Sequence, residues 1–234
     1  MTTFALVHGA WHGAWCWERL VPELATRGHR VITMDLPCDA AGATFETYAD
    51  VVCGALAAHA SDDVVVVGHS LAGLTIPLVA ARRPVSRLVY LCALVPSPGR
   101  SFVDQLSDED DDMLDQRYLA GLSQPDAERR RAWVDEVLAR EVLFADCDAQ
   151  TSRAAFERLR PQSPAPYARA CALDELPPAA STYIVCSADR LVNPAWSRRA
   201  ARQRLDADLV ELPGSHSPFL SRPAELAGIL HELG

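Results

Sequence analysis

One nine-residue stretch constrains the fold of this chain more than any other. Residues 65–73 read Val-Val-Val-Gly-His-Ser-Leu-Ala-Gly, so a β-branched run ends at Gly68 and an apolar segment follows Ser70. This pattern predicts a nucleophile elbow, a sharp strand-to-helix turn that exposes a serine hydroxyl. Small residues are needed there because the serine backbone is strained and the chain passes close to itself. Gly68 fits the usual G-x-S-x-G pattern, whereas the fifth position is Ala72 and a glycine follows at Gly73.

A glycine-serine turn between any strand and helix would look similar, so the rest of the chain has to decide. Apolar runs of strand length alternate along it with helix-like segments, which predicts a parallel sheet covered on both faces. Right-handed crossovers make this a doubly wound α/β domain. We expect strands at about 3–8, 30–34, 63–68, 86–92, 181–186 and 208–212. We expect helices at about 15–26, 45–60, 71–82, 195–205 and 222–232.

The alternation stops between residues 97 and 178. Prolines flank this stretch, and its patterns are helical, for example around 126–144, where apolar residues recur at helical spacing. We interpret it as a helical cap inserted over the carboxyl ends of the strands, where such sheets bind ligands. The sequence therefore predicts a core formed by 1–96 and 179–234 and a cap formed by 97–178.

Composition excludes several classes of function. The net charge is −9 and all 22 basic residues are arginine, so we expect no general nucleic-acid binding and no lysine chemistry. Hydrophobic residues make up 49% of the chain, yet no apolar run has membrane-spanning length. Alanine and arginine usage without lysine suggests a GC-rich bacterial genome. The charge runs Asp108–Asp112 and Arg129–Arg131 are interpreted as solvated helix faces rather than a binding patch.

The seven cysteines are scattered, and none forms a C-x-x-C pair. Neither a metal site nor a disulfide framework is indicated, and we expect most thiols to be small apolar fillers in a reducing cytoplasm. Cys186 falls on an expected strand and should belong to the core. The N-terminus enters a strand without a basic leader, so we expect no signal peptide.

A serine at an elbow needs a base and a group that orients the base. Asp189 follows the expected strand 181–186, and His216 lies on the loop after strand 208–212. Alone, the aspartate could be a loop or helix-capping residue, and the histidine could be a surface or structural one. With Ser70, however, they lie at one edge of a parallel sheet in the chain order Ser, Asp, His. This combination favours a catalytic triad.

Acyl transfer also needs hydrogen-bond donors for the oxyanion. We expect the backbone N–H groups of Leu71, directly after the nucleophile, and of Ala10, in the loop after the first strand. That loop could also be a phosphate-binding turn, but it lacks G-x-G-x-x-G and carries bulky side chains. His69 occupies the variable position of the elbow and is assigned no role in proton transfer.

With these residues in place, the chain resembles the α/β-hydrolase superfamily. Within it, the chain is similar to the branch of plant methylesterases, plant hydroxynitrile lyases and bacterial esterase relatives. The resemblance implies a core of six parallel strands with the helical insertion as a cap. The matching pieces are Leu6–Trp17, Arg27–Val31, Gly68–Gly73, Tyr183–Asp189 and Gly214–His216.

The same resemblance separates esterase from lyase. The lyases of this branch carry Thr or Asn where Gly9 stands, and the well-known ones carry Lys directly after the catalytic histidine, where Ser217 stands here. A lyase needs a cation to stabilise departing cyanide, so a hydroxynitrile lyase is disfavoured. His69 also matches the esterase members. Strand 86–92 is followed by no carboxylate, which supports Asp189 as the acid.

We therefore expect a serine esterase that cleaves a small or medium hydrophobic carboxylic ester through an acyl-enzyme, without a metal or an organic cofactor. A thioesterase, lactonase or acyltransferase would use the same residues. A slow-turnover ligand-binding receptor of this fold and a biosynthetic enzyme that eliminates or cyclises its substrate stay open. The expected partner is a small-molecule ester, with no nucleic acid and no membrane, and the sequence leaves open whether the chain forms a homodimer.

Substrate choice should depend on large apolar side chains of the cap and of the adjoining core. Nothing in the sequence supplies a clear counter-charge for a free carboxylate or phosphate near the triad. The candidate substrate contacts are Trp11, His12, Tyr118, Trp133, Leu143, Phe144 and Phe219.

Overall fold

A six-stranded parallel sheet forms the centre of the computed structural model, which describes residues 1–59, 63–109 and 113–234. The strand order is β2-β1-β3-β4-β5-β6, so the chain first builds one edge and then the other. All six predicted strands are confirmed, each to within one residue at either end. They are β1 (Thr3–Val7), β2 (Arg30–Thr33), β3 (Val64–His69), β4 (Arg87–Leu91), β5 (Ser181–Cys186) and β6 (Asp208–Leu212).

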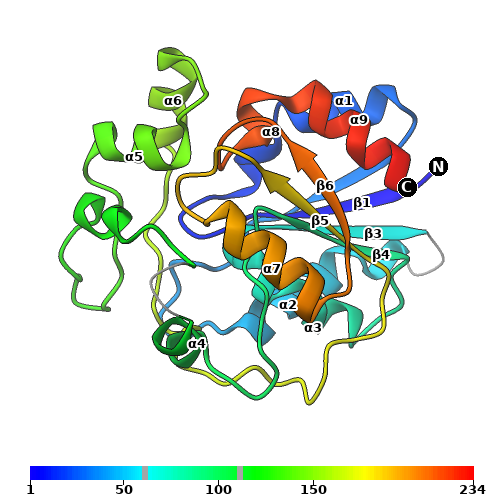
Figure 1. The fold of residues 1–234 in the computed structure, drawn as a ribbon, viewed down its shortest axis with the longest axis horizontal. Coiled ribbons are helices and arrows are strands. Elements are labelled where there is room, and N and C mark those ends of the chain that lie inside the picture. The colour runs from blue at the N-terminus through cyan, green and yellow to red at the C-terminus, as the bar shows by residue number, and fades with distance from the viewer. Residues whose placement is uncertain (60–62, 110–112) are drawn as a thin grey trace.

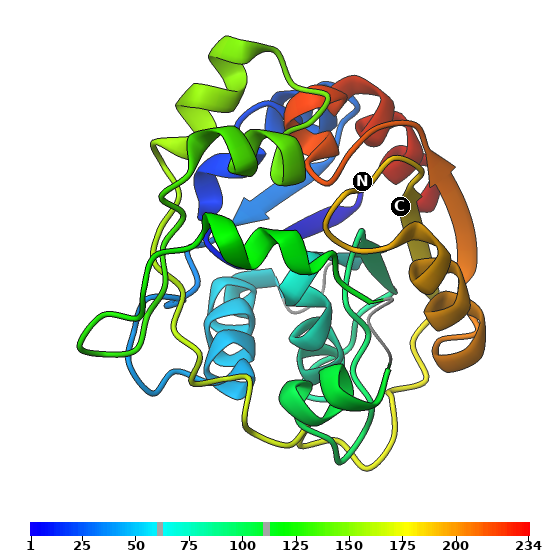
Figure 2. The ribbon, with the colours of Figure 1, turned by 60° about the vertical axis from the view of Figure 1, so that its left-hand side comes forward.

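Helices cover both faces of the sheet, which confirms the doubly wound α/β class. Helices α1 and α9 pack together on one face, and α2, α3 and α7 lie on the other (Figures 1 and 2). The α-helices around the sheet are α1 (Leu20–Thr26), α2 (Phe45–Ala55), α3 (Ile76–Ala80), α7 (Pro194–Arg204), α8 (Pro218–Ser221) and α9 (Pro223–Leu233). Short 3₁₀ turns are η1 (Ala14–Trp17), η2 (Ala57–His59) and η3 (Ser70–Leu74). No helix in the described part of the chain is both long and apolar enough to cross a membrane.

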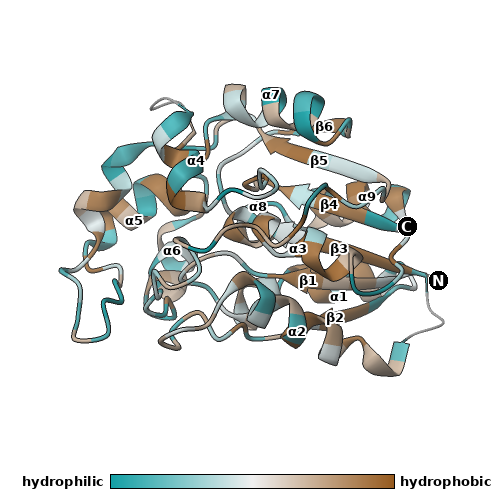
Figure 3. Cartoon of the chain, turned by 90° about the horizontal axis from the view of Figure 1, so that it is seen from below, coloured by the Kyte–Doolittle hydropathy of each residue, from teal (hydrophilic) through white to brown (hydrophobic). Residues whose placement is uncertain are grey.

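The burial of each strand depends on whether it lies at the centre or at an edge of the sheet. Every residue of β1 and β3 is buried, as a strand covered on both faces requires, whereas the edge strands β2 and β6 are partly exposed. Apolar colour accordingly concentrates on the strands and on the helix faces turned toward them (Figure 3). Cys186 is 1% exposed at the end of β5, as predicted from its place on an apolar run.

None of the described residues between β4 and β5 belongs to this sheet. It contains α4 (Phe102–Asp108), η5 (Gln116–Gly121), α5 (Glu136–Leu143) and α6 (Ala149–Phe156). Helices α5 and α6 stand apart from the sheet, on the side toward which the arrowheads of β5 and β6 point (Figure 1). This side is the carboxyl edge of the sheet, where α/β proteins bind their ligands.

The prediction of a helix around 126–144 is wrong for the first half of this range. Asp135 caps α5 by accepting a hydrogen bond from the Leu138 N–H, so the helix begins only at Glu136. The first half instead contains a turn at 127–128, and isolated antiparallel bridges join Leu122 to Trp133 and Arg131 to Gln162. These long-range pairs override the local helical spacing.

The prediction that both charge runs are solvated helix faces is also wrong in part. Within the acidic run, Asp108 forms an ion pair with Arg100, and Glu109 pairs with Arg204 and accepts a hydrogen bond from the indole of Trp196. Residues 110–112 of that run lie outside the described residues. The arginine run 129–131 follows a turn at 127–128 and precedes α5, so it lies outside the helices.

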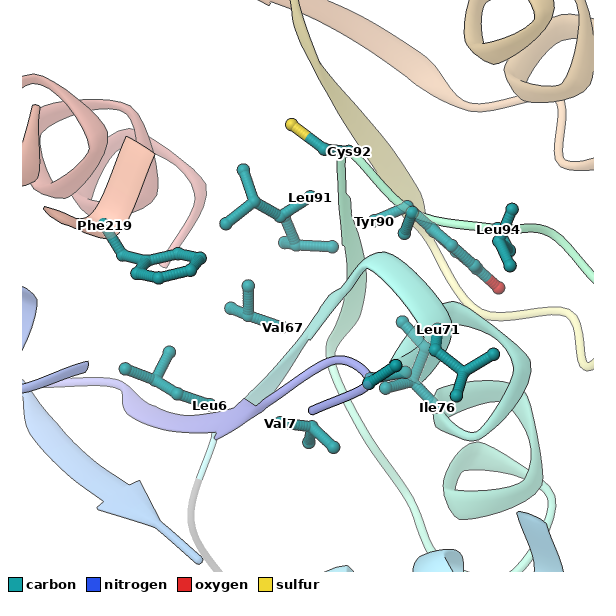
Figure 4. Close-up of a cluster of buried hydrophobic side chains, with 14 of the residues drawn as sticks. Leu6, Val7, Val67, Leu71, Ile76, Tyr90, Leu91, Cys92, Leu94 and Phe219 are labelled. Atoms are coloured by element: carbon teal, nitrogen blue, oxygen red, sulfur yellow. The ribbon is translucent and has the colours of Figure 1, made fainter. Parts of the chain in front are cut away.

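The elbow at the end of β3 has the expected sharp geometry. Ser70 has φ +52°, a left-handed conformation that non-glycine residues avoid. Close packing stabilises the turn, because a Cβ atom on Gly73 would lie 1.9 Å from the Leu94 carbonyl oxygen. Around it, Val67, Leu71 and Leu94 belong to the buried cluster shown in Figure 4. The glycine after the usual fifth position is therefore the one that permits close approach.

Replacing Gly73 by alanine tests this packing. We expect Gly73→Ala to lower the free energy of unfolding by about 2 kcal/mol or more, because the obstructing atom belongs to the backbone and cannot rotate away. The matched control is Gly54→Ala in α2, where an added Cβ meets nothing within 4 Å. That control should raise stability by about 0.5–1 kcal/mol, since alanine favours a helix. Urea unfolding measures both, and equal effects would contradict the packing argument.

Candidate active site

Four strands deliver the candidate residues to one edge of the sheet. Ala10 follows β1, Ser70 follows β3, Asp189 follows β5 and His216 follows β6. Because all strands are parallel, their carboxyl ends meet at the same edge. Residues distant in sequence are thereby brought into one region.

The loops after β5 and β6 are joined directly. The Ser187 N–H donates to the Leu212 carbonyl, and the Ala188 N–H donates to the Gly214 carbonyl. The Asp189 Oδ2 atom then lies 2.8 Å from His216 Nδ1, and the two side chains are only 3% and 1% exposed.

Asp189 is itself fixed by its second oxygen. Oδ1 accepts hydrogen bonds from the N–H groups of Leu191 and Val192, at 2.8 and 3.1 Å. The carboxylate therefore orients the His216 imidazole with Nδ1–H toward Asp189 and leaves Nε2 as a free base, the arrangement that a general base requires.

His69 links His216 to the elbow. Its Nε2 lies 2.9 Å from the His216 carbonyl oxygen, and since a carbonyl only accepts, Nε2 must carry the proton. The two imidazole rings are 4.6 Å apart between centroids. Burial lowers the pKa of His69 well below its usual value, and the neighbouring His216 adds to this. A neutral His69, the residue before Ser70 in the chain, thus holds the backbone of His216, a positioning role that the motif alone did not reveal.

The peptide unit before Ala10 is held by His8. His8 Nε2 accepts from the Leu36 N–H at 2.9 Å, so Nδ1 is protonated and donates to the Gly9 carbonyl at 2.8 Å. In a planar trans peptide the C=O and N–H bonds point in opposite directions. The bond to the Gly9 carbonyl therefore fixes the direction of the Ala10 N–H. A Cβ on Gly9 would lie 2.8 Å from the Ser70 Cβ, so only glycine fits between them.

The second expected donor is oriented in the same way. The Leu94 N–H donates to the Ser70 carbonyl at 3.0 Å. This carbonyl shares its peptide unit with the Leu71 N–H, which must point in the opposite direction. Both candidate oxyanion donors thus belong to peptide units that the surrounding fold has already oriented, which is the condition for electrostatic preorganisation.

Ser70, Ala10 and Leu71 line one cavity of about 260 Å³. Asp189 and His216 are not among the lining residues. Most of the wall is apolar, and much of it comes from the segment between β4 and β5. The other lining residues are Trp11, Leu94, Phe102, Leu114, Tyr118, Leu119, Leu122, Arg129, Arg131, Gln162, Pro164, Tyr167 and Leu191.

The predicted substrate contacts divide into two groups. Trp11 and Tyr118 line the cavity, with ring centroids 6.0 Å apart. The others are not lining residues and are almost completely buried in packing, so we do not propose them as substrate contacts. They are His12, Trp133, Leu143, Phe144 and Phe219.

Sequence reasoning missed most of the actual lining. Leu94 and Leu191 follow the ends of β4 and β5, a position that could have marked them as wall residues. Arg129 and Arg131 also line the cavity, so the expectation that no counter-charge lies near the candidate triad is wrong. Their only signal in the sequence is the arginine run 129–131, and a run of this kind predicts a solvated surface.

Buried histidines surround the candidate site. Burial lowers the pKa of His8 to about 4 and that of His12 to about 3. The lowered pKa values keep both rings neutral near pH 7, and His12 Nδ1 donates to the Ala10 carbonyl at 2.7 Å, as His8 Nδ1 does to the Gly9 carbonyl. In the unfolded chain each would titrate near pH 6.5.

Stability should therefore fall in mild acid. Between pH 6.5 and 4 the unfolded chain binds more protons at these histidines than the folded one does, so stability decreases as the pH falls. Each histidine contributes a slope of up to about 1.4 kcal/mol per pH unit. We expect His12→Asn, which keeps a donor for the Ala10 carbonyl but does not titrate, to make this loss shallower. Thermal unfolding midpoints of both proteins from pH 8 to 4.5 measure the difference, and parallel curves would contradict it.

Comparison with known proteins defines the class. A model of the alpha/beta hydrolase family matches residues 4–229, so the chain belongs to the α/β-hydrolase family. A pyrethroid hydrolase from Sphingobium faniae JZ-2 has a similar structure, with a TM-score of 0.86 and 26% identity over 99% of this chain and 96% of that one.

Two further proteins are similar to this chain in sequence. A carbendazim hydrolyzing esterase of Nocardioides sp. (strain SG-4G) is 40% identical over 112 residues, and the match spans 44% of this chain and about half (46%) of that relative. Norfluorocurarine synthase 2 of Strychnos sp. is 29% identical over 98% of this chain and 94% of its own length. The expected branch, with plant methylesterase-like and bacterial esterase relatives, is confirmed.

Proposed function

We propose that this chain is a carboxylic-ester hydrolase that uses Ser70, His216 and Asp189 as a catalytic triad. The esterase and hydrolase names among its relatives and structural neighbours support this class of activity. The observation that carries the residue assignment is the buried 2.8 Å contact between Asp189 Oδ2 and His216 Nδ1, formed between two loops at the edge where Ser70 is exposed to the cavity.

In this mechanism Ser70 Oγ attacks the ester carbonyl carbon while His216 Nε2 takes its proton. Asp189 stabilises the imidazolium that forms, and the N–H groups of Ala10 and Leu71 bind the oxyanion. His216 then donates the proton to the departing alcohol, which leaves an acyl group on Ser70. Water, deprotonated by the same histidine, releases the acid and restores the serine.

The cavity suggests the size of the substrate. Its volume of about 260 Å³ lies at the small end of ligand sites, and its wall is mainly apolar. Both features favour a small or medium ester with an apolar body. We propose residues 97–178 as the cap that gives the cavity its shape, over a core formed by 1–96 and 179–234.

Kinetics of two variants test the assignment. We expect Ser70→Ala and Asp189→Asn each to lower kcat/KM at least about a thousandfold on p-nitrophenyl butyrate, with unfolding midpoints close to wild type. Asp174→Asn is the matched control, because Asp174 is exposed and does not line the cavity that contains Ser70. An active Ser70→Ala protein would overturn the proposal, and a parallel assay with the butyryl thioester would show whether thioesters are preferred.

A further inference from the structure

Two arginines line the cavity that contains Ser70. Arg129 and Arg131 are among its lining residues, and the others are apolar or uncharged. Within the described part of the chain, no aspartate or glutamate lines this cavity. Although the chain has a net charge of −9, the charged residues among those described at this wall are both arginines.

Arg131 is held in place by four hydrogen bonds. Its N–H and C=O bond to the C=O and N–H of Gln162, at 3.1 and 2.9 Å, and its carbonyl also accepts from the Trp11 indole at 3.2 Å. Its Nε–H donates to the Ser123 carbonyl at 2.9 Å. Since Trp11 directly follows Ala10, the position of Arg131 is tied to the loop that carries a candidate oxyanion donor.

The terminal guanidinium nitrogens of Arg131 are available to bind a ligand. Its Nη groups have no hydrogen-bond or ion-pair partner among the described residues. Guanidinium groups bind planar carboxylates through two parallel hydrogen bonds. Arg131 is half-buried, lines the cavity and has no carboxylate partner among the described residues, so it is suited to an anionic ligand.

The three consecutive arginines of this run differ in whether a carboxylate neutralises them. Arg130, between the other two, is neutralised by Asp126 and Glu128, at 2.8 and 2.9 Å. Arg129 forms no ion pair with the described residues and has φ +63°, a strained conformation in which glycine would fit more easily. Strain retained at such a position often accompanies function. The acids of this turn thus neutralise the arginine that does not line the cavity.

We infer that the ester substrate carries an ionised carboxylate, which Arg131 and Arg129 bind while the ester carbonyl lies at Ser70. The inference rests on the proposed function and narrows its substrate class from neutral esters to half-esters of dicarboxylic acids or esters with an equivalent acidic group. The apolar wall would hold the carbon chain between the two ends. A neutral ester of the same length would leave the guanidinium groups without a partner.

Binding to the Ser70→Ala protein tests the carboxylate site without any requirement for turnover. Isothermal titration compares monoethyl adipate with ethyl hexanoate, a neutral ester of the same acyl length. We expect monoethyl adipate to bind at least about tenfold more tightly, and Arg131→Gln, added to Ser70→Ala, to remove this preference. Arg130→Gln in the same background is the matched control and should leave the preference within about twofold.

Arg129→Gln keeps the test decisive if Arg131→Gln lowers the unfolding midpoint, because the Arg129 side chain is exposed and supports no described ion pair. Equal binding of the two esters, or a preference that survives both substitutions, would overturn the inference. Hydrolysis by the wild-type protein separates the two proposals. Cleavage of ethyl hexanoate without any carboxylate preference would leave the esterase assignment intact, whereas arginine-dependent binding without cleavage of either ester would refute the esterase assignment alone.

Discussion

The left-handed turn at Ser70 is the constraint on which the site depends. A serine at φ +52° is unfavourable, so the surrounding structure must stabilise it. Gly73 allows the turn to pack against the Leu94 carbonyl, and the Leu94 N–H binds the Ser70 carbonyl in return. The same bond sets the direction of the Leu71 N–H. One packing arrangement between the elbow and the segment after β4 thus exposes the serine and orients a hydrogen-bond donor beside it.

Neutral, buried histidines have a comparable role on the other side of the turn. His8 fixes the peptide unit that carries the Ala10 N–H, and His69 holds the backbone of His216. Burial keeps both rings uncharged by lowering the pKa of each. A neutral imidazole can donate from one nitrogen only, so its hydrogen bonds define a single orientation. The buried histidines that position groups near the serine therefore also make the stability of the fold sensitive to acid.

Much of this architecture could be predicted from the sequence. Continuous apolar runs such as Val64–Val67 are typical of central parallel strands, and they located all six strands. Polar residues directly after those runs then had to meet at one edge, which brought Asp189 and His216 into contact as expected. Strand positions and chain order were sufficient because parallel topology fixes where strand ends lie.

The cavity wall could not be predicted in the same way. Phe144 and Phe219 looked like substrate contacts, but size and hydrophobicity do not tell whether a side chain faces the cavity or the core behind it. The helical spacing before Glu136 was overridden by pairing with Gln162, a contact that local pattern cannot reveal. That same pairing places Arg131 at the cavity.

A crystal structure of the protein inactivated by an ethyl fluorophosphonate would identify the nucleophile and the oxyanion donors in one measurement. We expect a covalent bond from Ser70 Oγ to phosphorus, with the phosphonyl oxygen within about 3 Å of the backbone nitrogens of both Ala10 and Leu71. His216 should then face the ester oxygen of the adduct while it keeps its bond to Asp189. Labelling of another residue would rule out Ser70 as the nucleophile, and a phosphonyl oxygen directed away from both nitrogens would rule out Ala10 and Leu71 as the oxyanion donors.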